Sequence, residues 1–308
     1  QIKVMDQDNL VNNNVSTLNG ESSGMNTTNL VQSNISKQIP FSSYSVEYNG
    51  VDDYFDLGAL QGTTLQPDDA TLISDGLSVS IWVNVAAIAE YGVWQNDGLG
   101  QADYVGLLLQ IKTGGEIIIG YSDGGGTLSN NRLTYFTTAA QITSVDTWYH
   151  IVAIYKGMGS SASPIAQGLY VNGVEVTAFD PPTGTASTLA YSASAKGSIG
   201  TIRDGVIPVN GKLSNCAVFD RTITQDEVLN IYNNGVPQDL QQSPTLSNNI
   251  IGWWPMDESY TYFDGSVLVA RDVTNSNDGN GENVVQENIV GNAPGSAANG
   301  TGTNLDLS

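Results

Sequence analysis

The chain has 308 residues, enough for one large β domain or two smaller domains with a sizeable core. Its 31 acidic and 10 basic residues give a net charge of -21, although charged residues make up only 13% of the chain. A chain this acidic repels phosphate backbones and anionic lipid, so we expect neither nucleic-acid binding nor a membrane-surface role. The same charge suits divalent cations, Ca²⁺ among them.

The one cysteine and the N-terminus add two further expectations. Cys216 excludes an internal disulfide, and in the apolar stretch LSNCAVF we expect a small buried residue rather than a nucleophile. The opening residues QIKVMDQDNL do not have the pattern of a signal peptide, and no apolar run in the chain is long enough for a transmembrane helix.

Residues 1–40 are rich in Asn, Ser and Thr, and their sparse apolar residues follow neither a helical nor a strand period. This composition predicts an extended polar N-terminal arm. Such an arm cannot offset its own ordering entropy, so we expect it to lie on another surface, most simply that of a neighbouring subunit.

Residues 41–236 have the pattern of short β-strands separated by Gly, Asn and Asp turns. In SVEYNGVDDYFDLG, residues 45–58, Asn49-Gly50 is typical of a type I′ turn and predicts an opening hairpin rather than an acidic catalytic cluster. Further strands are predicted over residues 78–84, 105–111, 116–121, 146–155, 167–176, 196–201 and 211–219. The first of them alternates, with Val79, Ile81 and Val83 on one face and Trp82 on the other, and Thr113-Gly114-Gly115 and Asn172-Gly173 predict hairpin turns. Together they predict an all-β fold, a two-layer antiparallel sandwich.

One short helix interrupts this pattern. Thr224 and Glu227 form a capping box before an apolar face, and Asn234-Gly235 ends the helix.

Residues 237–272 are predicted to be a connector followed by additional strands, the strongest of them in IIGWWPM at 250–256. These strands complete the same sandwich or begin a truncated second repeat; we favour the first alternative because too little chain follows for a second domain. Residues 273–308 are rich in Gly and Asn and are predicted to form a C-terminal arm.

The order of these segments resembles the laminin G-like, concanavalin A-like jelly-roll family over about residues 41–236. The segments that carry the resemblance are VEYNGVDDYFDLG, LSVSIWVN, the pair DTWYHIVAIYKG and LYVNGVEV, and GSIGTIRDGVIPVNGKLSNCAVFDRTITQDEVLNIYNNG. With polar arms at both ends, the chain is similar to structural proteins of marine bacterial viruses. The resemblance implies a virion-surface protein that decorates a capsid or forms part of a fibre, with capsid or fibre proteins and copies of itself as partners.

Catalytic chemistry has little support in the sequence, so we expect no enzyme. His150 is the only histidine, and it alternates with apolar neighbours along a strand, as a buried sheet histidine does. The Glu-x-Asp-x-x-Glu pattern of β-glucanases of this fold is absent, because Glu116 has no acidic partner two residues on and Asp257-Glu258 are adjacent.

Binding chemistry has candidates in the loops. Asp97, Asp123 and Asp272 each lie in an oxygen-rich loop that could hold Ca²⁺, the only cofactor the sequence suggests; the alternative is that these residues only form turns. Tyr91, Trp94, Tyr104, Arg203 and Asp204 are the candidates for contact with a glycan.

Three functions therefore stay open. The first is a non-enzymatic virion structural protein whose arms clamp neighbouring subunits. The second is a calcium-dependent adhesin, extracellular or on a cell surface, that binds host surface glycans. The third and least favoured is a glycoside hydrolase of the same fold.

Overall fold

The structure is a computed structural model that describes residues 43–98, 105–123, 132–157, 168–184, 188–193, 196–202, 205–257, 259–274 and 276–295. The predicted N-terminal arm and the end of the predicted C-terminal arm lie outside these residues. Within the described ranges, no helix is long and apolar enough to cross a membrane.

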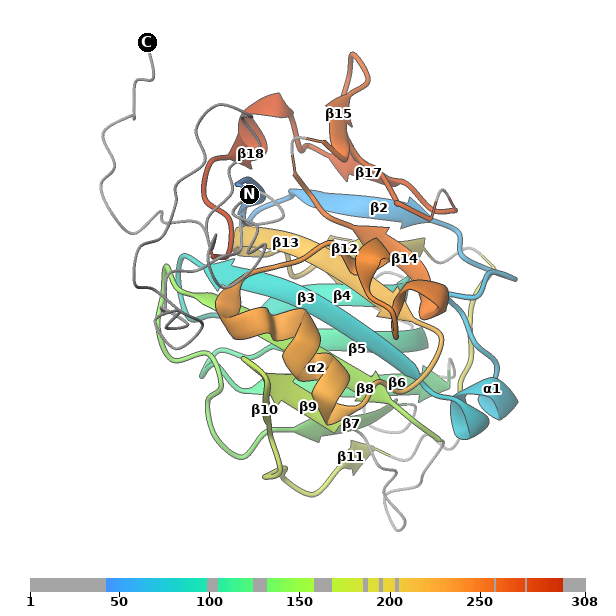
Figure 1. The fold of residues 1–308 in the computed structure, drawn as a ribbon. Coiled ribbons are helices and arrows are strands. Elements are labelled where there is room, and N and C mark those ends of the chain that lie inside the picture. Colours follow the sequence, from blue (N-terminus) through green and yellow to red (C-terminus); the bar gives the residue numbers. More distant parts are fainter. Residues whose placement is uncertain are drawn as a thin grey trace, which may run out of the picture. The chain divides into compact units, whose positions relative to one another are not determined.

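Two antiparallel sheets make up the described part of the chain (Figure 1). The first sheet has the order β10 (Val174–Glu175), β9 (Gly168–Val171), β8 (Trp148–Tyr155), β3 (Leu77–Val85), β13 (Asn210–Phe219), β1 (Ser45–Asn49) and β18 (Ile289–Val290), and β14 (Ile250–Trp254) also pairs with β13. The second has the order β11 (Thr183–Gly184), β7 (Arg132–Phe136), β6 (Ile117–Asp123), β5 (Val105–Ile111), β4 (Tyr91–Gly98), β12 (Lys196–Ile199), β2 (Tyr54–Gly58), β17 (Gly279–Glu282), β16 (Leu268–Ala270) and β15 (Thr261–Phe263).

The helices of the described part are short. They are α1 (Asp69–Ser74), α2 (Gln225–Tyr232), and the 3₁₀ turns η2 (Asn233–Gly235), η3 (Leu240–Gln242), η4 (Ser247–Asn249) and η5 (Gln286–Asn288). The capping box predicted for α2 is confirmed: Thr224 Oγ1 accepts from Glu227 N, and Glu227 Oε2 accepts from Thr224 N. α1 is an additional element that the sequence analysis did not predict.

The main core lies between the two sheets, so the predicted two-layer antiparallel sandwich is confirmed. The alternation predicted for β3 is confirmed too, because Val79, Ile81 and Val83 face this core while Trp82 faces away from it. Cys216 is buried in the same core, and burial raises the pKa of its thiol. A buried, protonated thiol is a packing residue, as expected.

A second apolar layer covers the outer face of the first sheet, where α2 crosses β3 and β8 (Figure 1). Val228 and Ile231 of α2 pack there against Val152 and Phe219 of the sheet. The predicted polar connector at 237–249 takes part in this layer, since Leu240 and Leu246 are buried in it. Burial of these leucines, not the polarity of their neighbours, decides the course of this segment.

Residues 250–295 belong to the same sandwich and do not start a second domain. β14 pairs with β13 in one sheet, while β15, β16 and β17 extend the other. The described part of the predicted C-terminal arm therefore contributes strands to both sheets. β17 pairs with β2 in the second sheet, and β18 pairs with β1 in the first. Glycine in this segment is a packing requirement: a Cβ at Gly281 would lie 2.7 Å from the Leu268 carbonyl oxygen.

The opening turn differs from the predicted hairpin. β1 belongs to the first sheet and β2 to the second, so the turn between them crosses from one layer to the other. Only Gly50 of Asn49-Gly50 has a positive φ, whereas a type I′ turn needs two. Asn49 Oδ1 accepts from the Val51 and Asp52 amides at 2.7 and 3.1 Å, and its Nδ2 donates to Asp52 and to buried Asp53, both at 2.9 Å. The acidic cluster is therefore part of a sheet-to-sheet turn.

The other predicted hairpins are confirmed. Asn172 and Gly173 both have positive φ, 52° and 77°, between the paired strands β9 and β10. β5 and β6 pair from Val105–Asp123 to Ile111–Ile117, on either side of the predicted Gly114-Gly115 turn.

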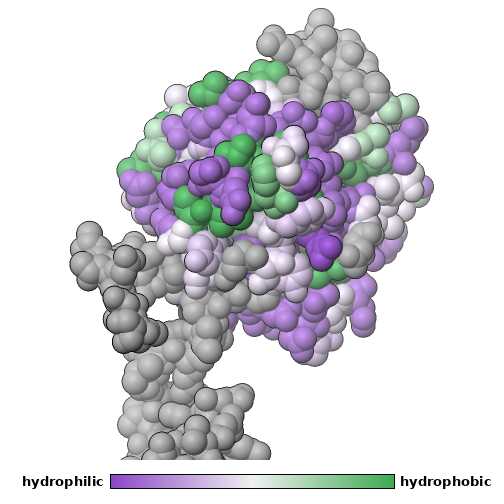
Figure 2. All heavy atoms as spheres, turned by 90° about the horizontal axis from the view of Figure 1, so that it is seen from above, coloured by the Kyte–Doolittle hydropathy of each residue, from purple (hydrophilic) through white to green (hydrophobic). Residues whose placement is uncertain are grey.

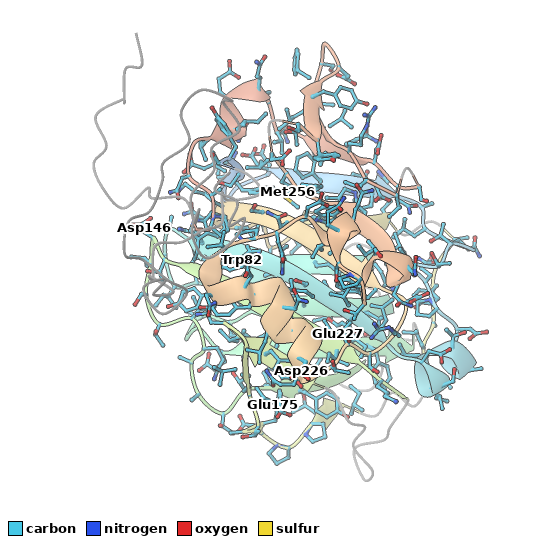
Figure 3. All side chains as sticks on the ribbon, in the orientation of Figure 1. Trp82, Asp146, Glu175, Asp226, Glu227 and Met256 are labelled. Carbon is cyan, nitrogen blue, oxygen red and sulfur yellow. The ribbon has the colours of Figure 1, made fainter. Side chains whose placement is uncertain are left out.

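His150 of β8 is buried beneath α2, next to Trp82, which Figure 3 labels beside this helix. Its ring stacks on Tyr232 at 5.9 Å and 15°, and its Nε2 lies 2.8 Å from Ser80 Oγ. Burial lowers the pKa of His150 from 6.5 to about 3, because the imidazolium would lose its hydration. The expected buried sheet histidine is confirmed, although Nδ1 has no hydrogen-bond partner among the described residues.

We predict that Asn49→Ala lowers the free energy of unfolding by about 2 kcal/mol, because it removes the hydrogen bond to Asp53 Oδ1 and leaves two turn amides without their side-chain acceptor. Urea unfolding of the variant and the wild type measures this difference. Val51→Ala in the same turn is the control, since Val51 is 72% exposed and should change stability little. Equal stability of both variants would contradict the structural role of Asn49.

We predict that His150 makes the protein less stable in acid. The unfolded state takes up this proton below pH 6.5 and the folded state only near pH 3, so stability falls as pH is lowered through that window. The slope reaches about 1.4 kcal/mol per pH unit for one proton. Urea unfolding from pH 4 to pH 8 should give a difference between wild type and His150→Gln that shrinks towards acid pH and is constant above pH 7. A difference that does not change with pH would contradict the buried neutral imidazole.

Candidate functional site

A polar groove of about 450 Å³ opens at one end of the sandwich, beside α1 and the start of β3. A volume of a few hundred Å³ is in the range of small-ligand sites. The residues that line it come from the β2–β3 connection and from the end of β13; they are Gly62, Thr63, Thr64, Gln66, Pro67, Asp68, Thr71, Asp75, Gly76, Leu77 and Asp220.

One wall of the groove is α1, at the lower right of Figure 1. Asp68 caps this helix by accepting from Thr71 N at 2.7 Å, and Gly76, with φ of 79°, follows its last residues. The helix is held to the sandwich because Gly157 N donates to Leu72 O and Thr222 N donates to Asp75 O, both at 2.8 Å. The Asp68 cap and the Asp75-Gly76 end were signals in the sequence that could have predicted this wall.

Gln66 is held at the base of this connection by the end of β4. Its Nε2 donates to Asn96 O at 3.1 Å, while Asn96 Nδ2 donates to Leu65 O at 2.7 Å. Tyr191 Oη donates to the neighbouring Pro67 O at 2.9 Å. Gln66 lines the groove, and its Oε1 is a buried acceptor without a hydrogen-bond partner among the described residues.

The charged side chains that line the groove are all acidic: Asp68, Asp75 and Asp220. Hydrogen bonds from Thr71 lower the pKa of Asp68. Arg221 adjoins Asp220 in sequence, but its guanidinium makes a bidentate pair with Glu227, at 2.9 and 2.7 Å. This pair raises the pKa of Arg221 and lowers that of Glu227 to about 2. The groove is therefore a site of negative potential.

Two of the three predicted aromatic ligands, Tyr91 and Trp94, are not available at the surface. Tyr91 and Trp94 are 5% and 1% exposed and belong to the core between the sheets. A β-bulge between Gly92 and Trp94 inserts Val93 and shifts the alternation, which brings Trp94 to face the core. Tyr104, Arg203 and Asp204 lie outside the described residues.

Exposed aromatic side chains lie instead on β15, which the sequence analysis did not predict. Tyr262 and Phe263 are 45% and 44% exposed, and the guanidinium of Arg271 lies 5.8 Å from the Tyr262 ring. The face of the protein shown in Figure 2 is mostly hydrophilic, with hydrophobic residues in small groups.

The described side chains among the predicted calcium ligands are those of Asp97 and Asp272; the side chain of Asp123 lies outside them. Asp272 is buried, and its carboxylate accepts from Trp253 N, Thr274 N, Thr274 Oγ1 and Asn277 N, which fills its acceptor positions and makes it a turn-forming residue. Asp123 ends β6 opposite Val105. Within the described ranges, no group of three or more acidic, His or Cys side chains is placed to hold a metal ion.

Asp97 has a carboxylate oxygen without a hydrogen-bond partner among the described residues. It is buried beside Asn96; its Oδ2 accepts from Ser192 N at 2.7 Å, and its Oδ1 has no partner among the described residues. Burial raises the pKa of this carboxyl to about 6. Asp97 therefore fits as one oxygen ligand of a hard cation, and further ligands would have to come from beyond its described neighbours.

Comparison with known proteins agrees with this architecture. The family model of the concanavalin A-like lectin/glucanases superfamily matches residues 57–229. No curated protein matches the chain.

Among solved structures, a Bacteroides ovatus protein described as a candidate carbohydrate-binding protein is similar, with a TM-score of 0.53 and 16% identity. The match covers 83% of this chain and 62% of the Bacteroides chain, so this chain spans less than two thirds of that protein. The CBM40 domain of Ruminococcus gnavus IT-sialidase has a TM-score of 0.40 and 13% identity over 61% of this chain and 96% of its own. Trypanosoma rangeli sialidase has a TM-score of 0.39 and 13% identity over 64% of this chain and 28% of its own.

At these identities the solved structures show a common fold and no more. The family match, which covers more than half of the chain, agrees with the two antiparallel sheets and the core between them. The chain belongs to the concanavalin A-like lectin/glucanases superfamily.

Proposed function

We propose that the protein is a non-enzymatic carbohydrate-binding protein and that its groove beside α1 holds the saccharide. The observation that carries this proposal is the lining of the groove, where carboxylates, threonine hydroxyls and a buried unpartnered Gln66 Oε1 are placed together. A saccharide presents many hydroxyl donors, and these match such a set of acceptors.

The superfamily supports a carbohydrate ligand but leaves two activities open, since it includes lectins and glucanases. The Bacteroides protein of similar fold is described as a candidate carbohydrate-binding protein, which agrees with the first of these. Fold alone does not choose between them, so the choice depends on the side chains of the groove.

The groove favours binding over hydrolysis. A glycosidase of the usual type needs a carboxylic acid with a raised pKa to protonate the leaving group. In the groove, the pKa of Asp68 is lowered because Thr71 donates hydrogen bonds to its carboxylate. This carboxylate is also committed to capping α1. We therefore infer a site that holds a saccharide without cleaving it.

The virion structural role stays a prediction. It depends on the contacts of the 1–40 arm, which lies outside the described residues. Location on a virion surface, and capsid or fibre proteins as partners, depend on the same arm. Carbohydrate binding is compatible with this role, because a protein on a virion surface can also bind host glycans.

Calcium dependence also stays a prediction. Asp97, with its free Oδ1, lies next to Asn96, the residue that holds Gln66. A cation at Asp97 would therefore be separated from the groove only by the contact between Asn96 and Gln66. We expect that removing this cation weakens saccharide binding.

We predict that Thr64→Trp, which places a bulky ring in the groove from an exposed position, weakens saccharide binding by at least about tenfold. Glycan-array screening identifies a ligand, and isothermal titration calorimetry then compares wild type and variant, each with and without Ca²⁺. Thr147→Trp is the matched control, since Thr147 is exposed and precedes β8 at the end far from Leu77, where the groove lies. Binding that survives Thr64→Trp, or the absence of any saccharide ligand, would contradict the proposed site.

A further inference from the structure

We propose that the groove selects saccharides that carry free, protonated amino groups, such as oligomers of glucosamine, over neutral or anionic saccharides. This inference rests on the proposed function, because it names the chemical class of ligand for the same groove. It is drawn from the hydrogen-bonding and charge character of the lining.

The side-chain donors of the groove are largely committed to the protein itself. Thr63 Oγ1 donates to Leu60 O at 2.7 Å, and Gln66 Nε2 donates to Asn96 O at 3.1 Å. Thr71 is bound through its side chain to the Asp68 carboxylate. Thr64 is the remaining hydroxyl in the lining. Among the polar side chains of the lining, a ligand therefore meets mainly acceptors, to which it has to donate its own hydrogens.

Most of these side-chain acceptors are negatively charged. Three of them are the exposed carboxylates of Asp68, Asp75 and Asp220, and no Lys, Arg or His lines the groove among the described residues. The nearby Arg221 does not line the groove; it interacts with the charge of Asp220, but its guanidinium donates to Glu227 and to the carbonyls of Thr222 and Thr245. An anionic sugar would be repelled here, and an ammonium group attracted.

A neutral acceptor accompanies these charges. Gln66 is 9% exposed, and its Oε1 is buried without a partner among the described residues that surround it. A buried acceptor is costly to leave unpaired, so a ligand that donates to Oε1 gains binding free energy. The carboxylates then favour a ligand that carries positive charge. Gln66 favours a ligand that has a hydroxyl or ammonium donor close to that charge. An amino sugar provides both.

A bare metal ion fits the groove less well than an organic cation. Within the described part of the chain, no three acidic side chains converge as ligands of one ion, although three line this groove. Carboxylates that are spread around about 450 Å³ fit several separated ammonium groups along an oligosaccharide instead.

The test uses the full chain and three tetramers of the same length, of glucosamine, N-acetylglucosamine and glucose, titrated by calorimetry at pH 6 in low and high salt. We expect the glucosamine tetramer to bind about tenfold more tightly than the other two, because exposed ion pairs contribute modestly and add. We expect this advantage to shrink at high salt.

Variants locate the effect. Asp75→Asn and Asp220→Asn should each weaken binding of the glucosamine tetramer by about threefold and leave the glucose tetramer unchanged. Asp226→Asn, the same change of charge on α2 away from the groove lining, is the matched control and should have no effect (Figure 3 labels Asp226). Thr64→Trp should abolish the preference.

The outcomes separate this inference from the proposed function. Equal binding of the three tetramers, or tighter binding of the N-acetylated one, overturns the inference and leaves a saccharide site in place. Glucosamine binding that survives Thr64→Trp shows adsorption to the acidic surface and also overturns the inference. If no tetramer binds to the wild type, both the inference and the groove as a saccharide site fall for these sugars.

Discussion

The burial of two apolar sheet faces against each other is the interaction on which the rest of this structure depends. Each sheet presents one set of alternate residues to the common core, which includes Val79 and Ile81 from one layer and Leu107 and Leu109 from the other. Because the strands are antiparallel and short, their connections collect at the two ends of the sandwich. Polar side chains that would be costly in the core are therefore carried by the connections, and the groove forms among them.

The position of the groove follows from how one connection is held. The β2–β3 segment leaves the second sheet and enters the first, and it is bound on the way by Asn96, Tyr191 and Thr222. These contacts use most of the donors nearby for structure. The segment contributes the exposed carboxylates of Asp68 and Asp75 and the unpartnered Gln66 Oε1 to the lining, and these groups give the groove its acceptor character.

The outer layer beneath α2 has a different role. Trp82, His150 and Tyr232 stack there in a buried cluster on the first sheet, away from the groove lining. A histidine whose pKa is lowered to about 3 is neutral over the physiological pH range. His150 therefore contributes to stability through packing, as a buried sheet histidine does.

The sequence by itself determined the local structure of this protein. Period-two alternation located β3, the Thr224 capping box located α2, and Asn172-Gly173 located a tight hairpin, because these signals act between residues close in the chain. Only the tertiary structure decided which sheet each strand joins, and that a bulge turns Trp94 towards the core. It also decided that Asp220 lines the same groove as Asp68, Asp75 and the buried Gln66. These outcomes depend on packing between segments far apart in sequence, which no local pattern encodes.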